Sequence, residues 1–381
     1  SYRGYAYQEA SLHGLLDRGL FKGNFEVKDP YLAFRFSGEA GFRGDTGRYD
    51  FEAELEKAHL HRLHWSDDTL TRLSAKLDMD FEAVDLQRWR GQIWLEDLDF
   101  RQGGRRYTAQ KTVLRADGMG RFKFLDLQSP LVEARLTGNF TPRGLQKAAQ
   151  YYRQRYAQGA RAEGMRPPVQ QARLSLRLQQ TQALTAMLAP RWAAEPGAQL
   201  RASYDTAQGL EVAAEFPALR YGDLLLRAGK VRYEGDYEQA RISATAGRLK
   251  LAGERHLDSL RWTARQRQGE LDFRLAAVVR DSIDAYLRHH GRISRQGGRR
   301  FDFRLDTTRF NVGKQDFRVA PGAHLVVDRG RFYVRSFLLR RGTDKVYLSG
   351  AISKSPYEVL RVQFEHLDIK QLLAVFPFVE R

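Results

Sequence analysis

Cysteine is absent from the 381 residues of the sequence. Its absence excludes disulfide bonds in any compartment, and it excludes zinc or iron–sulfur sites that depend on thiolate ligands. No apolar run reaches the roughly 18 residues that a membrane-spanning helix needs, and no signal peptide is visible at Ser1. Because the chain starts without Met and ends in the strand-like PFVER, we expect it to be a segment of a longer protein, with any anchor or signal outside it.

Catalytic motifs are also absent. The sequence has no phosphate-binding loop, no G-x-S-x-G nucleophile motif and no H-E-x-x-H metal motif. Its carboxylates alternate along the expected strands, as on any solvated face. The best candidate metal ligands are His59, His61 and His64. No carboxylate cluster adjoins them, which favours a solvent-exposed strand end over a metal site. We expect no enzyme, no cofactor and no metal.

The charge is strongly basic, with 63 Lys and Arg against 46 Asp and Glu, a formal net charge of +17. Two interpretations stay open: arginines decorating the solvated face of a large sheet, or a basic surface for nucleic acid or anionic lipid. The aromatic residues fall within the apolar alternation, which favours a core or groove wall over a base-stacking platform. We therefore expect no nucleic-acid partner.

Apolar residues recur at every second position through most of the chain, the period of a strand with one wet face. The clearest change of period follows the strand at 132–140, where Thr141 and Pro142 predict a helix start. Gly159 then predicts its end. The helix would carry an apolar stripe of Leu145, Ala148, Ala149, Tyr152 and Tyr156, which we expect to cover the rim or mouth of a groove.

Further elements follow from the same patterns. We expect a helical turn at Leu12, Leu15 and Leu16, and short helices at 181–188, 281–290 and 368–376. A hairpin is expected at 32–42 and 49–55, and a phase slip between Leu95 and Leu98 predicts a bulge. The hexapeptide RQGGRR occurs at 101–106 and again at 295–300, each time at an expected hairpin turn.

These elements predict the architecture. Roughly twenty strands are too many for one flat sheet, and the helices are too few for parallel βαβ units. The fold class expected is all-β: an elongated, curled, mostly antiparallel sheet, a half-pipe or repeating β-groove with an apolar inner wall and a few short amphipathic helices. We expect three groove segments, at 1–160, 161–291 and 292–381, in one continuous groove.

Three stretches resemble the TamB (translocation and assembly module) family of AsmA-like lipid-transfer proteins. They are DPYLAFRFSGEAGF with YDFEAELEKAHLHRL, then RFKFLDLQSPLVEARLTGNFTPRGLQKAAQYYRQRY, and finally KVYLSGAISKSPYEVLRVQFEHLDIKQLLAVF. The shared features are hydrophobic spacing with Gly and Asp, in the same order. The basic excess departs from the family.

The resemblance implies a middle segment of a periplasmic protein anchored in the inner membrane, whose groove carries phospholipid acyl chains between the two membranes. It also implies a role in outer-membrane biogenesis and protein assembly with a TamA- or BamA-like barrel partner, and membrane contacts made outside this segment. The alternative is a scaffold that captures strands of outer-membrane proteins by β-augmentation.

Alternate apolar positions supply the candidate groove wall. These residues are Leu32, Phe34, Phe36, Phe51, Leu77, Phe81, Leu136, Leu174, Leu176, Leu210, Val212, Leu271, Phe273, Leu275, Phe301, Phe303, Leu348, Ile352, Val362 and Phe364.

Overall fold

The chain divides into two compact units in the computed structural model. Unit 1 comprises Ser1–Gln146 and Val169–Thr206, and unit 2 comprises Lys147–Pro168 and Ala207–Arg381. The structure describes residues 3–43, 46–85, 87–103, 105–158, 169–180, 192–222, 224–236, 238–250, 256–267, 270–280, 284–295, 300–312, 315–328, 331–352 and 357–366.

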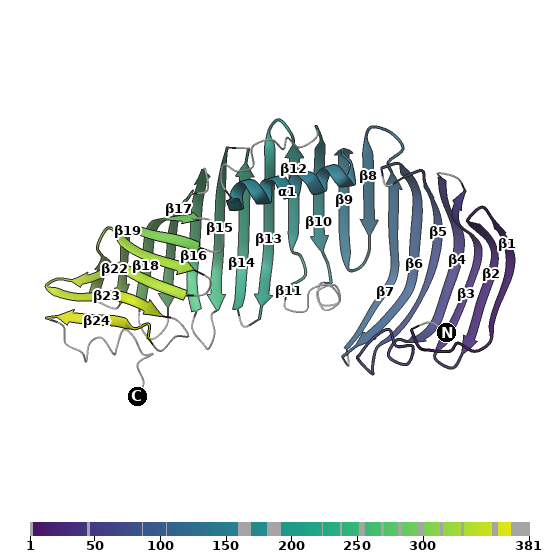
Figure 1. Ribbon diagram of the computed structural model, residues 1–381, viewed down its shortest axis with the longest axis horizontal. Helices are drawn as coiled ribbons and strands as arrows, with labels where there is room; N and C mark the ends of the chain where they lie inside the picture. The colour runs from purple at the N-terminus through teal and green to yellow at the C-terminus, as the bar shows by residue number, and fades with distance from the viewer. Residues whose placement is uncertain are drawn as a thin grey trace. The chain divides into compact units, whose positions relative to one another are not determined.

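Unit 1 is an open antiparallel array in which strands successive in sequence are neighbours from β1 to β10, and Figure 1 shows its strands bent along their length. Its strands are β1 (Ala10–Asp17), β2 (Leu20–Asp29), β3 (Leu32–Arg43), β4 (Thr46–His59), β5 (Arg72–Ala83), β6 (Trp89–Gln102), β7 (Arg105–Asp117), β8 (Lys123–Gln128), β9 (Val132–Asn139), β10 (Gln171–Leu178), β11 (Trp192–Ala194) and β12 (Gln199–Asp205). β10 pairs with β9 on one side and with β12 on the other.

Turn and bulge chemistry sets the register of unit 1. β3 and β4 form the hairpin that the alternation predicts, with Phe36 opposite Ala53. The predicted bulge is present as a register shift between β5 and β6, and Asp97 takes a φ of 53° there. Gly103 turns the chain between β6 and β7 with a φ of 57°, a conformation that glycine adopts without strain.

Unit 2 is likewise built from antiparallel strands. Its strands are β13 (Gly209–Tyr221), β14 (Leu224–Gly235), β15 (Gln239–Lys250), β16 (His256–Arg267), β17 (Glu270–Arg280), β18 (Asp284–Arg295), β19 (Arg300–Val312), β20 (Gln315–Val319), β21 (Ala323–Asp328), β22 (Arg331–Arg341), β23 (Asp344–Ile352) and β24 (Leu360–Glu365). β20 and β21 share one position in the sheet, because each pairs with part of β19 and part of β22. Pro321, which has no N–H to donate, lies at the break between them.

The all-β, antiparallel and open fold class is thus confirmed in each unit, and the strands are not closed into a barrel. Residue 291, where we expected a segment boundary, lies inside β18, which pairs with both β17 and β19.

Helix α1 (Pro142–Gln158) follows β9 as expected. The Thr141 hydroxyl accepts a hydrogen bond from the backbone N–H of Gly144 at 3.1 Å, so Thr141 is the N-cap. Within the expected stripe Ala148 and Tyr152 are buried and Leu145 is half-buried, whereas Ala149 is exposed. The side chain of Tyr156 lies outside the described residues.

Two expected helical segments are strands instead. Leu12, Leu15 and Leu16 lie in β1, where Gly14 opposes Gly23 of β2. Residues 284–290 belong to β18, which pairs along its length with β17 and β19. In both cases strand pairing outweighs a local apolar spacing that also suits a helix. The helices expected at 181–188 and 368–376 lie outside the described residues.

Candidate functional site

The candidate site is the apolar face of each sheet. In unit 1, the pairing register joins apolar residues from strand to strand into rows. One row runs Leu16, Phe21, Ala40, Tyr49, Phe81, Gly91, Ala116, Leu125, Leu136, Leu174, Ala202. The next row includes Phe51, Met79, Ile93, Leu114, Leu127, Ala134, Leu176 and Leu200. The face is therefore apolar across the strands of the unit.

Aromatic side chains line this face near the N-terminal strands. The Phe36 ring lies 4.9 Å from that of Phe51 and 6.0 Å from that of Phe21, measured between centroids. All three side chains are half-buried, because they shield one another and no second layer from the described part of the chain covers them. Half-burial leaves apolar area that a ligand can still remove from water.

One end of the face in unit 1 is closed. The turn after β4 folds back, so that Leu63, at 0% exposure, packs with Val27, Leu32 and Ala58. Leu60 from the same turn packs against a neighbouring cluster that contains Phe100, Tyr107, Ala109 and Leu131. The apolar face is thus a filled core at this end and a half-open wall farther along the strands.

A buried carboxylate anchors the closed end. The side chain of Asp29 accepts hydrogen bonds from the Tyr5 hydroxyl at 2.7 Å, from the Tyr31 N–H at 2.8 Å and from the Gln8 N–H at 3.0 Å. Burial acts to raise the pKa of Asp29, but these hydrogen bonds outweigh it and hold the pKa below its usual value. Burial, together with the hydrogen bond to Asp29, raises the pKa of Tyr5 to about 12.

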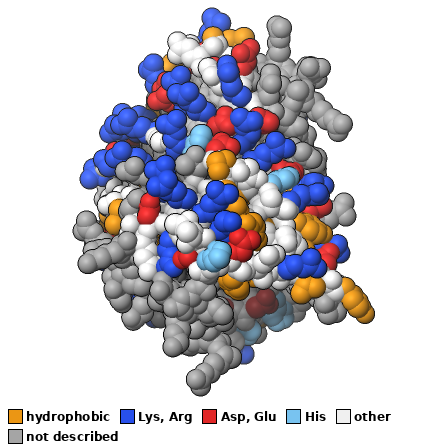
Figure 2. Space-filling model, turned by 90° about the vertical axis from the view of Figure 1, so that its left-hand side faces the viewer, with side chains coloured by type: hydrophobic (Ala, Val, Ile, Leu, Met, Phe, Trp, Pro, Cys, Tyr) orange, Lys and Arg blue, Asp and Glu red, His pale blue; other side chains and the backbone are white. Residues whose placement is uncertain are grey.

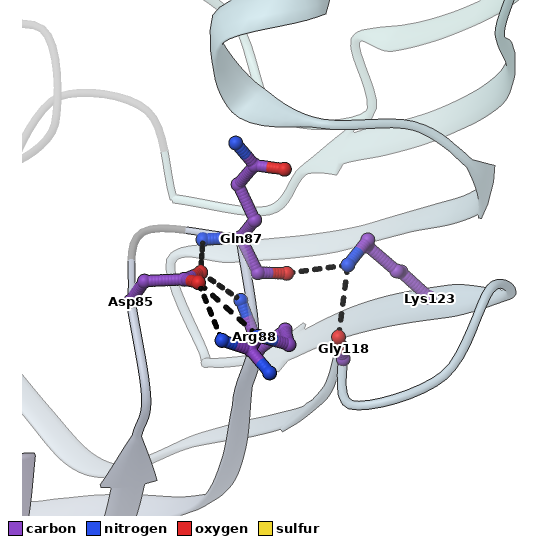
Figure 3. Close-up of polar contacts among 5 residues, drawn as sticks. All are labelled: Asp85, Gln87, Arg88, Gly118 and Lys123. Atoms are coloured by element: carbon purple, nitrogen blue, oxygen red, sulfur yellow. Dashed lines mark hydrogen bonds and ion pairs between the residues drawn. The ribbon is translucent and has the colours of Figure 1, made fainter. Parts of the chain in front are cut away.

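A buried lysine joins the turns at the opposite strand ends. Lys123 is 6% exposed, and its ammonium group donates to the carbonyl oxygens of Gln87 and Gly118, the latter at 2.8 Å (Figure 3). It also lies 5.9 Å from the centre of the Trp89 ring. The hairpin turns β5–β6 and β7–β8 are therefore tied together, which fixes this edge of the sheet.

The opposite face of unit 1 is polar. One row across six strands alternates in charge: Glu26, Arg35, Glu54, Lys76, Glu96, Lys111. Lys111 and Glu96 form an ion pair at 2.8 Å, and Arg35 pairs with Glu56. The two faces of the same strands thus differ completely in chemistry.

Unit 2 repeats this division. An apolar row runs Val212, Tyr233, Ile242, Ala264, Phe273, Gly291, Leu305, Ala323. Around β19–β23 the face is a filled core, where Leu305, Phe317, Val319, Ala323, Leu339 and Val346 are buried. Figure 2 shows many Lys and Arg side chains, with apolar side chains between them, on the side of unit 2 turned to the viewer.

By its register, every predicted wall residue belongs to the apolar face of its unit, but these residues differ in how far they are exposed. Most are half-buried: Phe34, Phe36, Phe51, Leu77, Phe81, Leu136, Leu174, Leu176, Leu210, Val212, Leu271, Leu275, Phe303 and Leu348. Leu32 and Phe273 are buried, whereas Phe301, Val362 and Phe364 are exposed. Ile352 pairs with Phe332, and its side chain lies outside the described residues.

The histidines do not converge. His61 contacts the backbone oxygen of Ser66 at 3.1 Å, and His64 contacts that of Arg3 at 3.0 Å. Burial and the positive charges of Arg72, Lys57 and Arg62 lower the pKa of His59. The described part of the chain contains no group of three His, Cys, Asp or Glu side chains placed to hold a metal.

The sequence reasoning missed the closure of the face by Leu63 and the anchoring roles of Asp29 and Lys123. In the sequence, Asp29 stands before Pro30, a pair that by itself indicates only a turn. A signal for the closure exists in Leu60 and Leu63, whose spacing of three breaks the alternation of β4 just after the strand ends.

Comparison with protein-family models, curated proteins and solved structures finds no match for this chain. Within the described ranges, no helix has both the length and the apolar character required to span a bilayer.

Proposed function

We propose that this chain is a segment of a periplasmic, inner-membrane-anchored lipid-transfer protein whose apolar face holds phospholipid acyl chains on their way between the two membranes. The observation that carries the proposal is the set of apolar rows that cross each sheet with most side chains only half-buried. A sheet face that merely served as a core would be covered by a second layer.

The energetics suit a transported ligand. Each methylene of an acyl chain that leaves water contributes about 0.8 kcal/mol. Because the rows pass from strand to strand without a charged member in unit 1, a chain lying along them gains contact continuously and meets no single dominant site. Binding spread in this way is compatible with movement along the wall.

The aromatic residues also support lipid over nucleic acid. Phe301 lies in a row with Val327 and Phe332, and Phe303 lies in a row with Leu325. The charged neighbours Asp302 and Arg304 alternate with them along β19 and so point to the other face. Stacked bases would need the aromatic and basic side chains together.

Site-specific photo-crosslinking tests the proposal. A photoreactive amino acid at Phe36, Leu77 or Phe81 is expected to yield lipid adducts in cells, detected by mass spectrometry of the purified protein. The matched positions Ser37 and Lys76 lie on the polar face of the same strands and are expected to yield none. Equal lipid labelling from positions on both faces, or no lipid adduct from either face, would refute the acyl-chain proposal.

A strand-capturing scaffold, working with an outer-membrane barrel partner, is the second candidate. The edge strand β1 favours it, because Leu12, Leu15 and Leu16 are 63–76% exposed and, among the described strands of unit 1, only β2 pairs with β1. The double variant L12K/L16K is expected to abolish strand capture in this case. Lipid adducts at Phe36 distinguish the two candidates, since the scaffold does not require them.

A further inference from the structure

A groove on the polar face of unit 1 has a chemistry that the acyl-chain wall does not use. It has a volume of about 1050 Å³ and lies over β7, β8, β9, β10 and β12. Its basic lining consists of Lys111, Arg115, Arg135, Arg177 and Arg201, against the two carboxylates of Asp126 and Glu133. The lining is therefore net positive.

The cations of this groove are incompletely neutralised. Arg135 pairs with Asp126 at 2.8 Å, and the same carboxylate is the one that Arg115 faces across the β7–β8 ladder. Arg177 and Arg201 form no ion pair with any residue that the structure describes. The groove thus presents guanidinium groups with free hydrogen-bond donors.

A second groove on the same face provides the contrast. It has a volume of about 760 Å³, lies over β2–β7, and contains Glu26, Glu52, Glu54, Asp78 and Glu96. Its basic residues Arg35, Lys76 and Lys111 are all in ion pairs. The basic residues that line this second groove are therefore neutralised, in contrast to Arg177 and Arg201 of the β7–β12 groove.

The sequence shows the same segregation. Residues 1–100 contain 13 Lys and Arg against 19 Asp and Glu, whereas residues 101–200 contain 17 against 5. The net charge of +17 is thus unevenly distributed, and the sign changes close to β7. A uniform coating of arginines on a solvated face would not change sign in this way.

We propose that the β7–β12 groove is a docking site for the phosphate groups of an anionic phospholipid bilayer surface. Guanidinium groups bind phosphate oxygens in a planar, two-donor geometry. The groove lining contains no aromatic side chain, so it lacks the stacking surfaces that single-stranded nucleic acid uses. The proposal goes beyond the acyl-chain wall, because the groove lies on the other face of the same strands.

Vesicle co-sedimentation tests this docking site. The intact chain is mixed with vesicles of phosphatidylcholine alone or of phosphatidylcholine and phosphatidylglycerol in equal parts. Binding is expected only to the anionic vesicles, and it should weaken as salt screens the charges. The triple variant R115Q/R177Q/R201Q is expected to bind about a hundredfold more weakly, since each basic side chain near an anionic surface contributes about fivefold in affinity.

A matched control removes the same charge from the acidic part of unit 1. The variant R35Q/R48Q/R90Q loses three arginines that form ion pairs on the polar face, and its binding is expected to change less than threefold. Circular dichroism checks that both variants fold. If the triple variant does not fold, the double variant R177Q/R201Q replaces it, and its affinity for the anionic vesicles is expected to fall about tenfold or more.

Three results would overturn the docking site. They are an equal loss of binding in the control variant, equal binding to uncharged vesicles, or tighter binding to duplex DNA with the same arginine dependence.

Photo-crosslinking at Phe36 reports on the wall alone. Loss of adducts with intact vesicle binding would therefore reject the acyl-chain function and leave the docking site standing.

Discussion

A carboxylate introduced at position 36 tests whether the apolar face holds acyl chains or serves only as a structural core. Phe36 is half-buried, opposes Phe25 and Ala53 in the ladder, and has its ring 4.9 Å from that of Phe51. In the variant Phe36→Asp, the ionised group keeps its hydration shell, so an acyl chain must leave the wall at this point. We expect the bound-lipid content to fall while the sheet persists.

The expected loss follows from the spacing of the strands. Neighbouring strands are about 4.8 Å apart, so a hydrated carboxylate denies the ligand contact over roughly one strand to either side. Forfeiting about four methylenes at about 0.8 kcal/mol each removes about 3 kcal/mol, or roughly a hundredfold in affinity. Native mass spectrometry, with a lipid titration of the delipidated protein, measures this change.

Two controls isolate the cause. Ser37→Asp introduces the same charge one residue along, on the polar face between Asn24 and Glu52, and it should retain lipid. Phe36→Ala removes the ring but leaves the wall apolar, so its affinity for lipid should fall less than tenfold. If Phe36→Asp and Ser37→Asp bind lipid equally well while both remain folded, the wall is not where acyl chains lie.

Two predictions concern the closed end of unit 1. Leu63→Ala should lower the free energy of unfolding by about 3 kcal/mol because it leaves a cavity among Val27, Leu32 and Ala58; urea denaturation measures it, and Leu70→Ala, at a site 56% exposed, should change it by less than about 0.5 kcal/mol. Asp29→Asn should lower the melting temperature at neutral pH. Because hydrogen bonds lower the pKa of Asp29 in the folded state, its stabilisation is present above the unfolded-state value of about 3.9 and is lost as pH falls through the lower folded-state pKa. The gap between wild type and variant should therefore narrow below about pH 4, and a gap that widened in acid would contradict this account of the Asp29 site.

The alternation of residue types determined the sheet because its information is local. In β5, for example, Leu73, Leu77 and Phe81 share one face whatever the strand pairs with, so the apolar wall could be inferred before any partner was known. The bulge near Asp97 was likewise visible as a slip in phase. The identity of neighbours followed from short connections, which favour hairpins over crossovers.

Other features depend on contacts between distant residues and gave no local signal. Leu12, Leu15 and Leu16 fit a helical turn as well as a strand, and only pairing with β2 decides between them. The same holds for β18. Lys123 carries no mark in the sequence of its burial, which depends on Gln87, 36 residues away, supplying a carbonyl oxygen.

Residue parity gives the molecule two independent surfaces. In a strand, neighbouring residues point to opposite faces, so Leu176 belongs to the apolar wall while Arg177 lines the basic groove. A substitution at one position leaves the chemistry of the other face intact, because the backbone ladder between them does not change. The excess of arginine is therefore compatible with the proposed acyl-chain wall. The basic groove lies on the opposite face of the strands, so the proposed membrane docking would not obstruct the proposed lipid path.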